Sequence, residues 1–144
     1  MKTHRITVSM LVILAFVLSA SVAAAGDFDW TKDLNVKAEA DRDGFKAQLS
    51  ARFNIGNAQV KVVLGNVDSP ADAYIVLCLG EMSSKSIDYV LNKYKANKNQ
   101  GWGALAKSLG IKPGSKEFHA LKQGNDIYHN TGKSKGKKKK KSKG

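Results

Sequence analysis

The chain has 144 residues, with 24 lysine and arginine residues against 12 aspartate and glutamate residues, two prolines and one cysteine. These totals exclude a collagen, a coiled-coil rod, a disulfide-stapled miniprotein and a multidomain enzyme. The net charge of +12 is uneven, because residues 131–144 contain eight lysines and no acidic residue, whereas residues 26–130 contain 14 basic and 12 acidic residues.

Residues 1–25 have the order of a secretory signal peptide. Basic residues come first, an apolar run follows from Met10 to Leu18, and the segment ends in small residues that fit an A-x-A cleavage site. We expect cleavage near Ala25 and a periplasmic or secreted mature protein. The alternative is an uncleaved anchor, since Ile6–Val22 approaches the roughly 18–20 residues that span a bilayer, but serines dilute this run.

The first half of the mature chain predicts a β-hairpin. Apolar and polar residues alternate over 34–40 and again over 45–55, which is the period of half-buried strands. Asp43-Gly44 lies between the two runs and favours a type I′ turn, whose register pairs apolar with apolar residues. A third strand is expected at Ala58–Leu64, so residues 26–66 are predicted to form a hairpin or a three-stranded meander.

Residues 67–124 predict a module of four short helices. Ser69-Pro70 is typical of a helix start, with a hydroxyl cap followed by proline at the first position. Residues 73–82 are apolar almost all round and form either a central helix, which the cap favours, or a buried strand. Apolar residues then recur at helical spacing over 87–94, 102–109 and 118–121.

The predicted fold class is therefore α+β: a β-hairpin or three-stranded meander packed against about four short helices. Cys78 lies inside an apolar run and is expected to be a buried small hydrophobe. Residues 125–144 are expected to be a disordered lysine-rich tail, because residues 132–144 contain only Gly, Ser and Lys and cannot bury apolar surface to offset the entropy of ordering.

The segment 101–122 combines a Gly-Trp-Gly element, a Leu-Gly-Ile-Lys-Pro-Gly-Ser element and a Glu-Phe-His-Ala-Leu-Lys element. It resembles a segment of uncharacterised exported proteins of bacteria, and Ser69–Tyr74 resembles the start of the same module. The resemblance covers residues 67–124 and implies export and a helical module. No activity, cofactor or ligand comes with it.

Two features of the body are candidates for a ligand or anion site. Trp102 lies between two glycines and is either an exposed platform or the inward-facing start of a helix. The turn Lys112–Ser115 is either an anion nest before a helix or a plain turn between helices. The candidate residues are Trp102, Lys112, Gly114 and Ser115.

We predict no catalytic, cofactor-binding or metal-binding residues, and no enzyme. His119 has no ligand-type side chain three or four residues away, and no nucleophile signature accompanies it. Residues 105–111 imitate the first half of a helix-turn-helix, but Pro113-Gly114 interrupts the expected recognition helix and export removes the chain from the chromosome. We therefore expect no role with chromosomal DNA.

The lysine-rich segment is the strongest functional feature. Flexible lysines bind polyanions by releasing counterions, and each contributes about 1 kcal/mol near an anionic lipid surface. We expect an exported non-enzymatic interaction protein whose tail binds an anionic envelope component, namely lipopolysaccharide, anionic lipid or an acidic polymer. The alternatives are a small-ligand or peptide-binding helical module in the envelope, and a tail that only keeps the protein soluble. The predicted polyanion-binding residues are Lys133, Lys135, Lys137, Lys138, Lys139, Lys140, Lys141 and Lys143.

Overall fold

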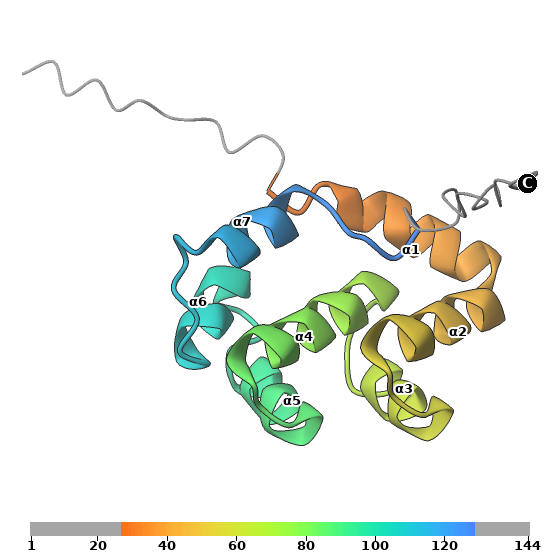
Figure 1. Ribbon diagram of the computed structural model, residues 1–144, viewed down its shortest axis with the longest axis horizontal. Coiled ribbons are helices and arrows are strands. Elements are labelled where there is room, and N and C mark those ends of the chain that lie inside the picture. The colour runs from red at the N-terminus through yellow and green to blue at the C-terminus, as the bar shows by residue number, and fades with distance from the viewer. Residues whose placement is uncertain (1–26, 129–144) are drawn as a thin grey trace, which may run out of the picture.

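The computed structural model describes residues 27–128, which form seven α-helices and contain no strand. The fold class of this part is all-α, so the expected α+β class is wrong. Figure 1 shows α4 in the middle, with α2 and α3 to one side, α6 and α7 to the other, and α1 across the top. The helices are α1 (Trp30–Ala40), α2 (Arg42–Phe53), α3 (Asn57–Leu64), α4 (Pro70–Ser83), α5 (Ile87–Ala96), α6 (Gly101–Ser108) and α7 (Lys116–Gln123).

The predicted hairpin is a pair of helices, α1 and α2. Only alternate members of the apolar pattern are buried: Leu34 and Ala38 in α1, and Phe45 and Leu49 in α2. Val36, between the first two, is 67% exposed. Apolar residues at i and i+4 lie on one face of a helix, and they also occur in any period-two pattern. Alternation alone therefore does not distinguish a strand from a helix. The intervening residues are mostly Ala, Lys, Glu, Gln and Arg, which are strong helix formers, and they favour the helix.

The Asp43-Gly44 pair lies in the first turn of α2, not in a hairpin loop. The Oδ1 atom of Asp41 accepts a hydrogen bond from the Gly44 N–H at 2.9 Å and so caps the helix. Asp43 adds a carboxylate near the positive end of the helix dipole. The residues that indicated a type I′ turn are therefore a helix start.

The predicted third strand, Ala58–Leu64, is helix α3. Val60 and Val63 are fully buried, whereas Val62 is 47% exposed. This spacing of three residues between buried positions is helical. Val62 and Val63 are adjacent apolar residues, which a strict alternation would not contain.

The four helices predicted after residue 69 are confirmed. Helix α4 starts at Pro70, with the Ser69 side chain accepting a hydrogen bond from the Asp72 N–H at 3.2 Å. All residues from Ala73 to Leu79 are buried, because α1, α3, α5 and α7 pack around α4. The buried-strand alternative for this segment is therefore wrong. Helices α5, α6 and α7 bury the predicted stripes, which include Val90, Leu91, Tyr94, Leu105, Ala106, Phe118 and Leu121.

Both ends of the described chain pack on the helices. At the N-terminal end, the Phe28 N–H donates to the Lys122 carbonyl at 2.7 Å and the Trp30 Nε1–H donates to the Leu121 carbonyl at 3.0 Å. After α7 the chain runs back toward α1 and α2; Ile127 is buried, and the Lys37 ammonium lies 5.4 Å from the centroid of the Tyr128 ring. Residues 125–128, which the sequence grouped with the tail, thus lie on the body.

Two predicted segments lie outside the described residues. The signal peptide falls within residues 1–26, and all eight tail lysines fall within residues 129–144. Export, cleavage and tail disorder therefore stay predictions. Within residues 27–128, none of the helices combines the length and apolar character needed to cross a membrane.

Candidate functional site

A cavity of about 690 Å³ lies on the body between α2, α4, α7 and the segment that follows α7. Pockets for small molecules typically enclose about 300–1,000 Å³. On α4, the residues at 74, 78 and 82 are four positions apart, so they share the face that lines the cavity. The apolar lining consists of Tyr74, Cys78, Met82, Ala120 and Leu121.

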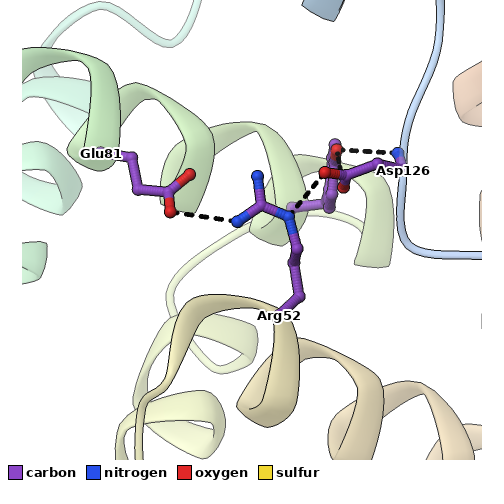
Figure 2. A network of polar contacts seen from close by, with 4 residues as sticks. Arg52, Glu81 and Asp126 are labelled. Atoms are coloured by element: carbon purple, nitrogen blue, oxygen red, sulfur yellow. Dashed lines mark hydrogen bonds and ion pairs between the residues drawn. The ribbon is translucent and has the colours of Figure 1, made fainter. Parts of the chain in front are cut away.

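A polar network joins three segments at the edge of this cavity (Figure 2). The Arg52 guanidinium lies between two carboxylates: its Nε–H donates to Asp126 Oδ2 at 2.7 Å and an Nη1–H donates to Glu81 Oε1 at 3.0 Å. Asp126 is also held by Tyr74, whose hydroxyl donates to Asp126 Oδ1 at 2.7 Å and accepts from the Asp126 N–H at 3.1 Å. The network therefore fixes α2 and the segment after α7 to the central helix α4.

The network favours the charged forms of Arg52 and Asp126. The hydrogen bond to Glu81 raises the pKa of Arg52 above its ordinary value; burial opposes this, and Asp126 adds to it. Burial raises the pKa of Asp126, but hydrogen bonds from Tyr74 and Arg52 outweigh burial, so this pKa lies below its ordinary value. Both groups are ionised at neutral pH.

Cys78 contributes a neutral thiol to the cavity wall. It is 4% exposed, and burial raises the pKa of its thiol to about 12. The thiolate, which is the nucleophilic form, is therefore scarce at neutral pH. The prediction that Cys78 is a buried small hydrophobe is confirmed.

Asn125 supplies an unpaired acceptor. This residue lines the cavity, and its Oδ1 atom is buried without a hydrogen-bond partner among the described residues. Leaving a buried polar atom unpaired costs about 1–3 kcal/mol. Because the atom itself has almost no accessible surface, a ligand in the cavity does not reach it.

Trp102 lines a second, smaller cavity of about 200 Å³ together with Asp68, Asp72, Tyr94 and Lys98. Its ring stacks on Tyr94, with centroids 5.8 Å apart and planes 23° apart. The Tyr94 hydroxyl donates to Asp72 at 2.8 Å, and Lys98 pairs with Asp68 at 2.7 Å. Trp102 is half-buried: it packs against the core and also lines this cavity. Its role as a platform for a ligand stays a prediction.

The predicted anion turn does not join Trp102. Lys112, Gly114 and Ser115 do not line the Trp102 cavity. The Ser115 N–H donates to the Lys112 carbonyl at 2.9 Å, and the Ser115 hydroxyl accepts from the Phe118 N–H at 3.3 Å, which caps α7. These bonds are those of a turn between α6 and α7, and anion binding there stays a prediction.

His119 is exposed on α7 and lines neither of these cavities. In residues 27–128, no three His, Cys, Asp or Glu side chains are placed to hold a metal ion.

The Arg52 network was not predicted from the sequence. Arg52 and Asp126 are 74 positions apart, and Arg52 was expected on the polar face of a strand. No local pattern connects these residues. The one available signal was the i, i+4 spacing of Tyr74, Cys78 and Met82 on a helix already expected to be central.

Comparisons with protein-family models, curated proteins and solved structures found no match to this chain. The resemblance to exported bacterial proteins therefore stays a prediction. The functional proposals below rest on the residues and the geometry of this chain.

Proposed function

We propose that this chain is an exported, non-enzymatic interaction protein whose C-terminal lysine segment holds it to an anionic envelope component. The carrying observation is the charge distribution: residues 131–144 contain eight lysines and no acid, whereas residues 26–130 contain 14 basic and 12 acidic residues. Charge of one sign is thus concentrated at one end of the chain.

The charges of the folded body further support the proposal that the lysine segment carries the binding. Some of its basic side chains are paired internally, as in Lys98 with Asp68 at 2.7 Å and Lys122 with Asp27 at 3.2 Å. A nearly neutral body attracts polyanions weakly, so the attraction falls to the lysine segment. Lysine ammonium groups act as compact point charges with little stereochemical demand. The shared ligand chemistry is therefore a dense array of phosphates or carboxylates.

The first experiment compares the full chain with a variant lacking residues 131–144. Vesicles of phosphatidylcholine alone and of an equimolar mixture with phosphatidylglycerol serve as probes in a sedimentation assay. We expect the full chain to bind only the mixed vesicles and to be released by salt, because binding depends on counterion release. The deletion should lose binding while its circular dichroism spectrum stays unchanged; binding that survives the deletion contradicts the proposal.

Two matched variants separate charge from other properties of the tail. Replacing all eight tail lysines by arginine keeps the charge and should keep binding, whereas replacing four of them by glutamine should reduce the slope of log K against log salt by about half. Parallel assays with lipopolysaccharide and with polyglutamate distinguish phosphate from carboxylate sources. A tail that only keeps the protein soluble would bind none of these probes.

A second candidate function is binding of a small ligand by the helical body. The observation that favours it is the 690 Å³ cavity between α2, α4 and α7. This cavity shares no lining residue with the Trp102 cavity, and Lys112 lines neither of the two.

A further inference from the structure

We propose that the cavity between α2, α4 and α7 binds a small amphipathic organic cation. The apolar part of the ligand would lie against α4 and α7, and its ammonium group would face the carboxylates at the mouth. This inference specifies the ligand of the second candidate function and rests on it. It is independent of the lysine segment.

The wall of the cavity fits an apolar group. Tyr74, Cys78 and Leu121 are 3–4% exposed and Met82 is half-buried, so together they form an apolar surface fixed by the packing of α4 against α7. The raised pKa of Cys78 keeps its thiol uncharged, so this wall is apolar at neutral pH. Met82 adds a flexible thioether that adapts to the shape of a ligand.

The charges of the cavity select a cation. One guanidinium and three carboxylates line it, which gives a formal charge of −2. The guanidinium of Arg52 is already bonded to Glu81 and Asp126, and it is therefore poorly placed to attract an anion. Glu81 and Asp126 are 51% and 48% exposed, so these carboxylates lie at the mouth.

Glu117 is the carboxylate most available to a ligand. It is exposed on α7, lines the cavity and takes part in none of the ion pairs found within residues 27–128. An ammonium group at the mouth would therefore meet an unpaired carboxylate there. Because this site is exposed to water, the gain should be modest.

The lysine segment of the chain itself is a poor occupant. Residues 132–144 contain only Gly, Ser and Lys, so they supply ammonium groups without an apolar body to cover Tyr74 and Leu121. The site fits a ligand that carries both parts in one small molecule.

The test uses the full chain labelled with ¹³C at the methionine methyl groups and followed by NMR. Met82 lines the cavity and reports locally, so binding of an anionic probe to the lysine segment does not confuse the result. The probes are phenylbutylamine, phenylbutanol and phenylbutanoate, which share one apolar body and differ in charge. We expect the amine to shift the Met82 signal with a Kd about threefold lower than the alcohol and about tenfold lower than the carboxylate.

Three variants locate the site. Glu117→Gln should raise the Kd of the amine about threefold and leave the alcohol unchanged. Glu39→Gln, an exposed charge change on α1 at a different cavity, should alter neither. Ala120→Trp, at an exposed α7 position that lines the cavity, should fill it and abolish the Met82 shifts with both probes.

Three results would overturn the proposal. The first is no shift of Met82 with any probe, the second is equal or tighter binding of the carboxylate, and the third is unchanged amine binding in Ala120→Trp with an otherwise native spectrum. None of these results bears on vesicle binding by the lysine segment, so failure of this proposal and failure of the tail proposal are distinguishable.

Discussion

At the scale of single residues, Arg52 and Asp126 connect parts of the chain that are distant in sequence. Their ion pair spans 74 positions, and Tyr74 on the central helix holds the same carboxylate. A carboxylate with two polar partners is held more firmly than one in an isolated surface pair. Asp126 therefore couples the end of the described chain to α2 and α4.

We predict that Asp126→Asn lowers the free energy of unfolding by roughly 1 kcal/mol at neutral pH, a small value because the pair is half-exposed and screened by water. Since the folded pKa lies below the ordinary value of 3.8, the carboxylate stabilises the fold above that pH. This contribution is lost as the pH falls from 3.8 through the lower folded pKa. Urea unfolding from pH 7 to pH 2 should show the two proteins converging at the acid end.

The matched control is Asp43→Asn. Asp43 pairs with Lys46, at 3.2 Å, and its side chain is 96% exposed. We expect a smaller loss of stability there. Equal losses at both positions would mean that the Arg52 network adds nothing beyond an ordinary surface charge.

At the scale of helices, the N-terminus of α4 is capped in part by a residue of another helix. Ser69 accepts from the Asp72 N–H at 3.2 Å, and Asn35 of α1 accepts from the Ala71 N–H at 2.7 Å. Pro70 has no N–H to satisfy. At the start of α4, one free N–H group is thus bonded to the adjacent cap residue and another to a residue of a neighbouring helix.

We predict that Asn35→Ala destabilises the protein by about 1 kcal/mol, the usual effect of losing a cap. Alanine is also the better helix former, so the comparison needs a matched change. Asn92→Ala, at an exposed position of α5, has the same propensity gain without a lost cap and should be neutral or stabilising. Equal midpoints of urea unfolding in the two variants would show that the Asn35 bond contributes no stability.

The helices that the sequence predicted are those whose signals are local. Ser69, Ser86 and Ser115 each accept a hydrogen bond from the N–H three residues later, so the caps mark the starts of α4, α5 and α7. In the first half of the chain, the sequence did not mark the helix starts as clearly. Its alternation included many alanines, which pack in either structure, and the choice of helix depended on propensity and on burial against α4.

At the scale of the molecule, the described helices share one core. The sequence predicted two regions that meet near residue 66. However, α1 and α3, which precede that boundary in the chain, pack on α4, which follows it. Phe28 and Trp30 likewise pack on α7. The cavity beside Arg52 is lined by residues from α2, α4, α7 and the segment after α7, which are far apart in the sequence, so no single stretch of sequence predicted it.

We predict that residues 67–124 alone do not fold. Without α1 and α3, one side of the apolar helix α4 would be exposed to water, and little core would remain. Circular dichroism of this fragment should show weak helicity and no cooperative thermal transition. The control is the chain lacking residues 131–144, which should unfold like the full protein; cooperative unfolding of the fragment would establish a separate domain.

The buried thiol of Cys78 also makes it possible to measure how often the folded core opens. Only 4% of the Cys78 surface is exposed, at the cavity wall, and its thiolate is scarce at neutral pH, so rapid labelling by an aqueous thiol reagent requires the surrounding helices to separate. The rate of labelling in native buffer then measures how often the core opens, without any denaturant. In an oxidising compartment the same shielding keeps two molecules from joining through their only cysteine while they remain folded.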